Sequence, residues 1–424
     1  MLDINILREN PTLIKKNEER RSRDPKNVDD VLALDEKWKK SLKTMESLKH
    51  QRNVVSQEIN QAKKSGKSAQ DKIKEMQQVA AEIKKTELKV NDLLEKRDAK
   101  LLLLGNIISQ ETPSGKDDKG NKEIKTWGKK PKFTFPVKNH VELAESLDLA
   151  NFDASGKTSG NGFYFLKGGL ALLNQALIRF AIDFMHGKGY TYIEPPLMLR
   201  GNILSAAIDV NEWKENIYAV EGEDLALIGT SEHALLGFHS GQTLPEQELP
   251  KKYFSYSMCF RKEIGSHGIN EKGLWRTHQF NKVEQFIFCK PEESVKIYDE
   301  LLHNTEELMQ ALGLPYRVLE ICTGDLALWK YRSADIEVYR PTTEDYGEVC
   351  SLSNCTDYQA RKLNIKVVYN DTNRKVLHTL NNTALATSRI MVAILENLQT
   401  KQGTVKIPQA LWPYMNGITE LGKQ

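Results

Sequence analysis

The stretch CFRKEIGSHGINEKGLWRTHQFNKVE, residues 259–284, is the most informative part of this chain. It opens with Arg261 and Glu263, two positions apart, which share one face if the segment is a strand. It closes on three side chains spaced four apart that can also share a face: Arg276, Phe280 and Glu284. Two arginines, an aromatic ring and two carboxylates suit a ligand with phosphates, a flat ring and an amine, such as ATP beside an amino acid.

The segments on either side of this stretch alternate and are rich in aromatic residues. YFSYSMCFRKE (253–263) and QFNKVEQFIFC (279–289) therefore predict the two strands of a long hairpin. Residues 190–199, YTYIEPPLML, predict a strand interrupted by Pro195 and Pro196. Further short strands are predicted at 335–341 and 348–353, and helices at 168–188, 293–312 and 385–400.

Hairpin-connected strands with helices at the ends indicate an antiparallel sheet in an α+β domain. Neither GxGxxG nor GxxxxGK[ST] occurs in the chain, so the nucleotide-binding folds that depend on those loops are not supported.

Residues 34–104 carry a heptad pattern in two halves around KKSGKS (63–68), where Gly66 is placed for a tight connection. The first half has seam positions Leu34, Trp38, Ser41, Met45, Leu48, Arg52, Val55, Ile59 and Ala62, and the second has Ile73, Met76, Ala80, Ile83, Glu87, Val90, Leu94, Arg97, Leu101 and Leu104. Two such halves of similar length predict an antiparallel helical hairpin, each helix roughly 45 Å long.

The basic excess of the chain sits in this hairpin. The whole chain has 60 lysines and arginines against 57 acidic residues, a net charge of +3, whereas residues 34–104 alone carry +6. The lysines are either solvated positions of a coiled coil or a surface that lies along a phosphate backbone. Composition does not choose between these interpretations.

Composition also bounds the class of protein. Five cysteines in 424 residues make no disulfide framework and fit a reducing compartment. Cys350 and Cys355 lack partners at zinc-type spacing, so buried thiols are favoured and no zinc is expected. The start MLDINILREN is no secretory signal, and no window approaches the ~18 apolar residues that span a bilayer. We expect a soluble, cytoplasmic protein without a membrane contact.

Five segments, taken in their order along the chain, together resemble the seryl-tRNA synthetases, which are class II aminoacyl-tRNA synthetases. The segments are the helix–strand unit ending at Pro195–Pro196, GTSEHALLG (229–237), CFRKE with GLWRTHQFNKVEQF, EVCSLSNCTDYQARKLNIK (348–366) and LNNTALATSRIMVAILEN (380–397). The first, third and fifth resemble the three class II motifs, of which the first lies at the dimer interface in that family.

The resemblance implies a domain plan and an activity. It implies an N-terminal tRNA-binding domain over 1–110 with a coiled-coil hairpin at about 30–105, a polar linker over 111–135 and a class II catalytic domain with an antiparallel β-sheet over 136–424. The implied activity is ATP-dependent ligation of L-serine to tRNA(Ser) through seryl-adenylate, with AMP and diphosphate released. It also implies a homodimer, binding of tRNA(Ser) by the helical arm, and charging of selenocysteine tRNA with serine where that tRNA is present.

The resemblance further assigns roles in ATP binding. Arg261 would hold the α-phosphate, Phe280 would stack on adenine and Arg389 would close over the nucleotide from the last helix. The full implied ATP set is Arg261, Lys262, Glu263, Arg276, Thr277, Phe280, Glu348, Val349, Cys350, Ser351 and Arg389, of which Arg261 and Arg389 are the catalytic residues. Glu348 and Ser351 would hold the Mg²⁺ that accompanies ATP, because a hard cation prefers oxygen ligands.

The implied serine pocket is rich in carboxylates and hydroxyls: Thr230, Ser231, Glu232, Glu284 and Thr383. Glu284 fits the ammonium of the substrate, and Thr383 fits its side chain. Such a pocket rejects alanine or glycine because its polar groups would be left unpaired. Adenylation by positioning and charge stabilisation needs no catalytic base, and none is nominated.

One segment departs from the family pattern. After TGD (323–325) the family usually continues through small residues, whereas this chain has Trp329, Lys330 and Tyr331. The ATSR ending at Arg389 is nearer the eukaryotic and archaeal style of the family than the bacterial one.

Three other functions are weighed against this one. A class II synthetase for another amino acid, such as threonine or proline, is disfavoured by the TSE triplet at Thr230, by Glu284 and by the hairpin. A synthetase-like regulatory module without charging activity is disfavoured by the retention of both arginines of the 259–284 stretch and of Arg389. A coiled-coil interaction protein is disfavoured by the ordered segments that follow the hairpin.

Overall fold

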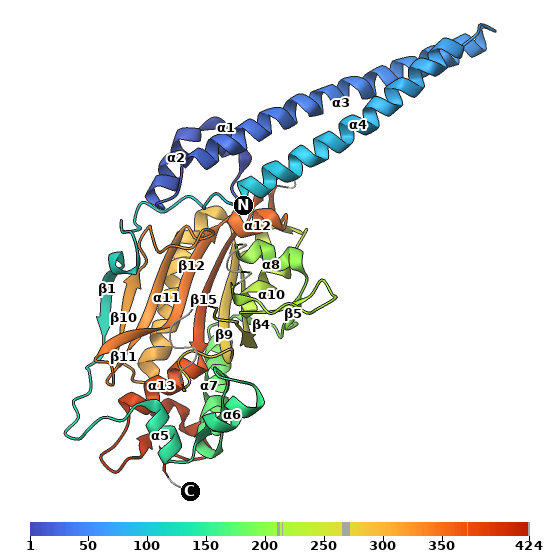
Figure 1. The fold of residues 1–424 in the computed structure, drawn as a ribbon. Helices are drawn as coiled ribbons and strands as arrows, with labels where there is room; N and C mark the ends of the chain where they lie inside the picture. Colours follow the sequence, from blue (N-terminus) through green and yellow to red (C-terminus); the bar gives the residue numbers. More distant parts are fainter. Residues whose placement is uncertain (210–212, 214, 265–271, 371, 423–424) are drawn as a thin grey trace. The chain divides into compact units, whose positions relative to one another are not determined.

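The structure, a computed structural model, describes residues 1–209, 213, 215–264, 272–370 and 372–422 (Figure 1). The chain divides into two compact units. One comprises Leu2–Gly105, and the other comprises Asn106–Gln424 together with Met1. No helix in the described part of the chain has the length and apolar character needed to cross a bilayer.

The Leu2–Gly105 unit is entirely helical. Its helices are α1 (Ile4–Glu9), α2 (Pro11–Arg20), α3 (Lys26–Lys64) and α4 (Gln70–Leu101). Helices α3 and α4 run side by side as an antiparallel hairpin, which confirms the predicted arm (Figure 1). The reversal contains Gly66 at φ 68°, a left-handed conformation that glycine adopts without steric penalty.

The hairpin seam follows the predicted heptads only in part. Ile83 and Val90 are buried as predicted, but Val79 is buried where Ala80 was expected. An α-helix drifts by ~20° per heptad relative to a strict seven-residue repeat, so the residue that faces the partner helix changes along the seam. Glu87, a predicted seam position, is exposed and pairs with Lys49 of α3 at 2.9 Å.

A buried carboxylate ties this helical unit together at the base of the hairpin. Asp35 is 1% exposed and lies 2.8 Å from Arg8, 3.1 Å from Lys39 and 3.3 Å from Arg97. The Arg97 guanidinium also lies 4.8 Å from the centre of the Trp38 ring. Burial raises the pKa of Asp35, but the hydrogen bonds from Arg8 and Lys39 more than offset it and hold the pKa below its ordinary value.

The second unit is built on an eight-stranded sheet whose strands are antiparallel except for one parallel pair at an edge, β4 with β8, which confirms the predicted α+β class. In spatial order the strands are β1 (Lys122–Trp127), β10 (Tyr316–Glu320), β11 (Arg332–Arg340), β12 (Asp345–Thr356), β15 (His378–Ala386), β9 (Gln279–Cys289), β8 (Lys251–Phe260) and β4 (Thr191–Tyr192). Strands β8 and β9 form the predicted hairpin, and the turn residues 265–271 between them lie outside the described part of the chain.

Helices and small sheets surround this large sheet. The helices are α5 (His140–Ser146), α6 (Phe152–Thr158), α7 (Gly168–Gly187), α8 (Gly201–Ala207), α10 (Ser231–Gly237), α11 (Ser294–Ala311), α12 (Tyr358–Lys362) and α13 (Thr387–Asn397). The short strands are β2 (Ala150–Asn151), β3 (Phe165–Leu166), β5 (Met198–Leu199), β6 (Ala226–Leu227), β7 (Thr243–Pro245), β13 (Lys366–Tyr369), β14 (Asn373–Val376), β16 (Val405–Lys406) and β17 (Glu420–Leu421).

The two faces of the large sheet carry different cores. Successive side chains of a strand point to opposite faces. On β9, Val283 and Ile287 pack into a core with apolar residues of α7, α11 and α13. Phe286 and Phe288 point the other way, into a core with residues of α8, α10 and α12. Glu284 shares the face of Phe286, so this second face carries polar groups next to its core.

Two sequence predictions differ from the structure in this unit. The predicted linker over 111–135 contains strand β1, which pairs with β10 at the edge of the sheet. The predicted strand over 190–199 is split into β4 and β5, which belong to different sheets, because Pro195 and Pro196 lack the N–H groups that a continuous ladder needs.

Replacing Asp35 by asparagine is expected to loosen the base of the hairpin. The change removes the buried carboxylate that Arg8, Lys39 and Arg97 share, although Arg97 keeps its pair with Asp98, and we expect the free energy of unfolding to fall by about 2 kcal/mol, between the values for exposed and fully buried ion pairs. Hydrogen–deuterium exchange of the full-length chain measures this as roughly thirtyfold faster exchange of the slow amides of α3 and α4 near their base.

The matched control is Glu36→Gln. Its carboxylate is 64% exposed and 4.0 Å from Lys39, so a change of less than about 0.5 kcal/mol is expected. The pKa of Asp35 is lowered on folding, so its contribution is complete above the ordinary value of 3.8 and is lost as the pH falls through the lower folded pKa. Equal exchange in Asp35→Asn and wild type would contradict a structural role for the cluster.

Candidate active site

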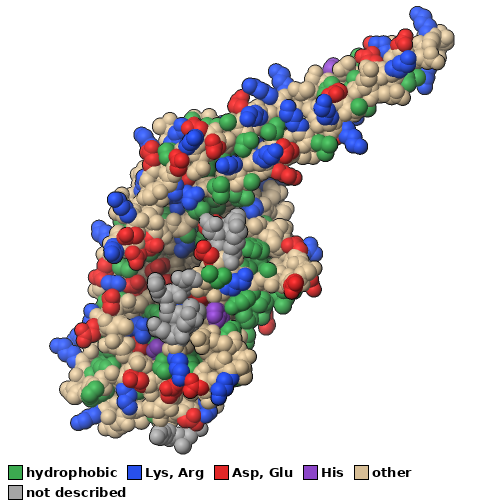
Figure 2. All heavy atoms as spheres, in the orientation of Figure 1, with side chains coloured by type: hydrophobic (Ala, Val, Ile, Leu, Met, Phe, Trp, Pro, Cys, Tyr) green, Lys and Arg blue, Asp and Glu red, His purple; other side chains and the backbone are tan. Residues whose placement is uncertain are grey.

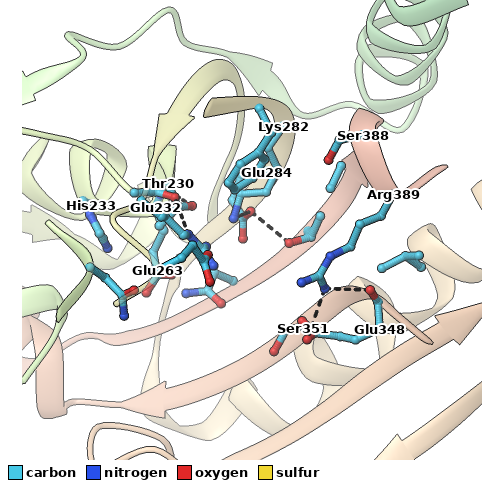
Figure 3. Close-up of a pocket in the computed structure, with 18 of the residues that line it drawn as sticks. Thr230, Glu232, His233, Glu263, Lys282, Glu284, Glu348, Ser351, Ser388 and Arg389 are labelled. Carbon is cyan, nitrogen blue, oxygen red and sulfur yellow. Dashed lines mark hydrogen bonds and ion pairs between the residues drawn. The ribbon is translucent and has the colours of Figure 1, made fainter. Parts of the chain in front are cut away.

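A cavity of about 390 Å³ lies on the second face of the sheet and brings together most of the predicted site residues (Figure 3). Its walls come from β9, β12, β15, α10 and α13, from the loops that follow β8 and precede β9, and from the segment that carries Trp329 and Lys330. The predicted residues that line it are Thr230, Glu232, Arg261, Glu263, Arg276, Thr277, Phe280, Glu284, Glu348, Val349, Ser351, Thr383 and Arg389.

Three predicted residues do not line this cavity. Cys350 follows Val349 on β12 and its side chain lies in the core on the other face, with Sγ 4.0 Å from the carbonyl of Ala384. Ser231 is fully buried in the first turn of α10. The Lys262 ammonium lies 5.9 Å from the centre of the Tyr218 ring. Sequence adjacency to a site residue does not place these side chains in the cavity; for Cys350 the reason is that neighbours on a strand point to opposite faces.

Arginines and an aromatic ring form one wall of the cavity. The guanidinium carbon of Arg261 lies 5.3 Å from the centre of the Phe280 ring, and its Nε donates to the carbonyl of Gly229 at 3.1 Å. Arg276 donates to the Glu263 carboxylate at 2.7 Å. This wall can hold phosphates and a flat ring next to each other.

Glu263 reaches the cavity by a route that the sequence did not predict. We expected it to share a strand face with Arg261, but β8 ends at Phe260 and Glu263 has φ 54°, in the left-handed region. The strand-face prediction is therefore wrong. Glu263 lies in the cavity wall, where its carboxylate forms an ion pair with Arg276.

The opposite wall is closed by Arg389 at the start of α13. Arg389 points toward β12, where Nη1 lies 2.6 Å from the Glu348 carbonyl oxygen and 3.2 Å from its carboxylate (Figure 3). Its Nε donates to the Trp275 carbonyl at 3.3 Å. Burial raises the pKa of Glu348, but the charge of Arg389 more than offsets it and holds the pKa below its ordinary value.

One end of the same cavity is rich in carboxylates and forms a pocket around Glu284 and Glu232. Glu284 pairs with the Lys282 ammonium at 2.7 Å and accepts from the Thr383 hydroxyl at 3.2 Å. Glu232 accepts from the Gln359 side chain at 2.9 Å. Burial and then the charge of Glu284 raise the pKa of Glu232. Two close buried carboxylates create a negative potential that favours an ammonium group.

Oxygen ligands next to Glu348 fit a divalent cation. Glu348 and Ser351 line the cavity from β12, and Asp335 lies opposite Ser351 in the β11–β12 register. The Oδ1 atom of Asp335 is buried without a hydrogen-bond partner among the described residues, and burial followed by the charge of Glu348 raises the pKa of Asp335 to about 7. Carboxylate and hydroxyl oxygens are the ligands of hard cations, so this group suits a metal that enters with ATP. Within the described ranges, no group of three or more His, Cys, Asp or Glu side chains is arranged to hold a metal ion.

The cavity contains residues that the sequence prediction missed. Lys282 precedes Glu284 by two positions on β9, and Asn381 precedes Thr383 by two on β15, so strand alternation could have found both. Trp275 and Lys330 carried no such signal. His233 also lines the cavity, and burial and the charge of Arg261 lower the pKa of this histidine to about 3, which keeps it neutral.

Comparison with known families covers both units of the chain. The family model of the tRNA synthetase class II core domain (G, H, P, S and T) matches residues 216–398, and that of the seryl-tRNA synthetase N-terminal domain matches residues 1–108. The serine–tRNA ligase of Methanocella arvoryzae is 43% identical over 425 residues, covering 99% of this chain and 100% of that protein. The serine–tRNA ligase of Pyrococcus furiosus is 43% identical over 437 residues, covering 98% and 96%.

Solved structures agree with these sequence matches. The seryl-tRNA synthetase from Pyrococcus horikoshii complexed with ATP superposes with a TM-score of 0.93 at 40% identity, covering 100% of both chains. The cytoplasmic serine–tRNA ligase from Naegleria fowleri in complex with AMP gives 0.88 at 34% identity, covering 100% of this chain and 99% of that one. These matches over the whole length confirm the resemblance: the chain belongs to the seryl-tRNA synthetase family of class II aminoacyl-tRNA synthetases.

Proposed function

We propose that the cavity binds ATP and L-serine side by side and that the chain joins serine to tRNA(Ser) in two steps. The serine carboxylate attacks the α-phosphorus and displaces diphosphate to give seryl-adenylate. The terminal ribose hydroxyl of the tRNA then attacks the seryl carbonyl and displaces AMP. The observation that carries this proposal is the junction, in one cavity, of the Arg261–Phe280 wall with the Glu284–Thr383 pocket.

The ATP end of the cavity is proposed to work by position and charge. Arg261 would neutralise the α-phosphate as negative charge develops on the leaving diphosphate, and Phe280 would stack on the adenine ring. Arg276 and Arg389 already lie in the wall, each held by a carboxylate, so little conformational entropy is lost when ATP binds. Glu348 and Ser351, with Asp335 behind them, would hold the Mg²⁺, which stabilises charge on the phosphates when bound.

The serine end is proposed to select its substrate by polar groups. Glu284 would accept from the substrate ammonium, and Thr383 and Glu284 together would bind its hydroxyl. Alanine has no hydroxyl to bind Glu284 and Thr383, so part of the hydrogen-bonding capacity of these buried groups would stay unused, which disfavours alanine. Glu232 adds a second carboxylate on the ammonium side, 2.9 Å from the Gln359 amide that orients it.

The helical arm is proposed to bind tRNA(Ser). Lysine and arginine side chains are distributed along the whole length of α3 and α4 (Figure 2). A two-helix arm with little core presents nearly all of its length as surface, and its ammonium groups can contact phosphates without reading sequence. We further propose a cytoplasmic homodimer, and charging of selenocysteine tRNA with serine where that tRNA is present.

The test that decides the substrate is amino-acid-dependent exchange of pyrophosphate into ATP. Serine is expected to support exchange. The exchange rate with threonine, proline or alanine should be lower by a factor of about 10³ or more, because alanine lacks the hydroxyl that the pocket binds and threonine and proline are too large for it. Exchange with threonine or proline instead would favour a different class II synthetase. No adenylate with any of these amino acids would favour a regulatory protein.

Replacing Thr383 by valine tests the serine pocket. The change keeps the shape but removes the hydroxyl that donates to Glu284. We expect kcat/KM for serine in the exchange reaction to fall roughly 10- to 100-fold, because a hydrogen bond to a charged group is lost, with an unchanged KM for ATP. The preference for serine over alanine is expected to fall by a similar factor.

Thr158→Val is the matched control, since the Thr158 hydroxyl is exposed on α6 and donates only to its own helix, to the carbonyls of Ala154 and Ser155. Its exchange kinetics should match wild type. A Thr383→Val enzyme with unchanged serine preference would contradict the proposed contact with the substrate.

Replacing four exposed arm lysines by glutamine tests the proposed tRNA contact. With Lys64, Lys67, Lys74 and Lys84 changed together, exchange should stay within about twofold of wild type because the cavity is untouched. Charging of total tRNA with labelled serine should fall roughly tenfold or more, and its salt dependence should become shallower as phosphate contacts are lost.

Four exposed lysines of the other unit, Lys129, Lys157, Lys401 and Lys406, form the control set for the same charge change. If the arm variant charges tRNA as well as this control does, the lysines are only solvated positions of a coiled coil. A parallel loss of exchange and charging would contradict the division of labour between arm and cavity.

A further inference from the structure

Lys330 lies in the cavity beside the residues proposed to hold the cation that accompanies ATP. Its ammonium is 3.3 Å from the hydroxyl oxygen of Ser351 and 3.1 Å from that of Ser333. It lines the same cavity as Glu348, Ser351 and Arg389. The stretch Trp329–Tyr331, where this chain has bulky residues in place of the small ones usual in the family, therefore places an ammonium group within the site.

The backbone around Lys330 is held firmly. The amide of Lys330 donates to the Ala327 carbonyl, and the next amide, that of Tyr331, donates to the Asn354 carbonyl of β12 at 2.8 Å. The carbonyl on the other side, that of Trp329, accepts from the Asn106 side chain at 3.0 Å. The backbone is therefore fixed on both sides of Lys330, and the contacts with Ser333 and Ser351 direct its ammonium into the cavity.

The charge of Lys330 acts on the carboxylates of the cation site. It adds to the larger effect of Arg389 in lowering the pKa of Glu348, and it opposes the burial that raises the pKa values of Asp335 and Glu232. The other lysine of the cavity, Lys282, sits at the serine end and pairs directly with Glu284. The two lysines thus lie at different ends of the cavity, and Lys330 lies at the end that contains Glu348 and Ser351.

We propose that Lys330 binds a phosphate of ATP and supplies part of the charge neutralisation that a divalent cation supplies at Glu348 and Ser351. This rests on the proposed binding of ATP in the cavity. A lysine ammonium is a compact charge with three donors, so Lys330 can donate to a phosphate oxygen from its place beside the Ser333 and Ser351 hydroxyls. ATP binding then persists in part when divalent metal is removed.

The experiment measures binding of ATP and of adenosine to the full-length chain by calorimetry, in excess EDTA and in saturating Mg²⁺. For Lys330→Met in EDTA we expect the ATP dissociation constant to rise about tenfold, because a charged hydrogen bond is lost. The adenosine dissociation constant should stay within about twofold, because adenosine has no phosphate. In saturating Mg²⁺ the change for ATP should be less than about threefold, and Lys330→Arg should retain most of the metal-free affinity.

Lys401→Met, an exposed lysine outside the cavity, is the control for loss of a positive charge. The proposal is overturned if wild type binds no ATP in EDTA, if Lys330→Met binds ATP there as wild type does, or if ATP and adenosine weaken equally, which would show a structural role. Wild type that binds no ATP even with Mg²⁺ would instead overturn the proposed function together with this inference.

Discussion

The register between strands β9 and β15 is the constraint on which the site depends. It places Glu284 directly opposite Thr383, and the hydroxyl of one donates to the carboxylate of the other at 3.2 Å. Strand β9 pairs on its other edge with β8, and Arg261 follows the end of β8. A slip of one residue would turn every side chain of β9 to the opposite face and would put Val283 in the cavity in place of Glu284.

Charge balance follows from this arrangement. Cationic side chains in the cavity wall face carboxylates, as in the pairs Lys282–Glu284, Arg276–Glu263 and Arg389–Glu348, of which the first is fully buried. Such pairs contribute little net stability, because desolvation offsets the attraction between the charges. Their effect is to hold arginine and carboxylate groups in fixed positions before a substrate arrives, which lowers the entropy that catalysis by position would otherwise lose.

Much of the fold followed from local patterns. The alternation of 253–263 and 279–289 predicted β8 and β9, because successive side chains of a strand point to opposite faces of the sheet. The heptads predicted the α3–α4 hairpin. Because a straight helix drifts relative to a seven-residue repeat, the buried seam residue is Val79 and not the predicted Ala80. The linker prediction missed β1, because a strand at the edge of a sheet needs no apolar side chains: all six of its residues are exposed.

What the sequence determined by itself was the set of elements and the chemical character of the site: two arginines, a ring and carboxylates at spacings that strands and helices bring onto one face. Only the tertiary structure decided which neighbours enter the cavity. Cys350 and Lys262 are adjacent to site residues in sequence but point elsewhere, whereas Lys330, which had no recognisable partner in the sequence, lies 3.3 Å from Ser351. The reason is physical: local periodicity sets the direction of a side chain, but contact across strands depends on register and long-range packing, which no local pattern encodes.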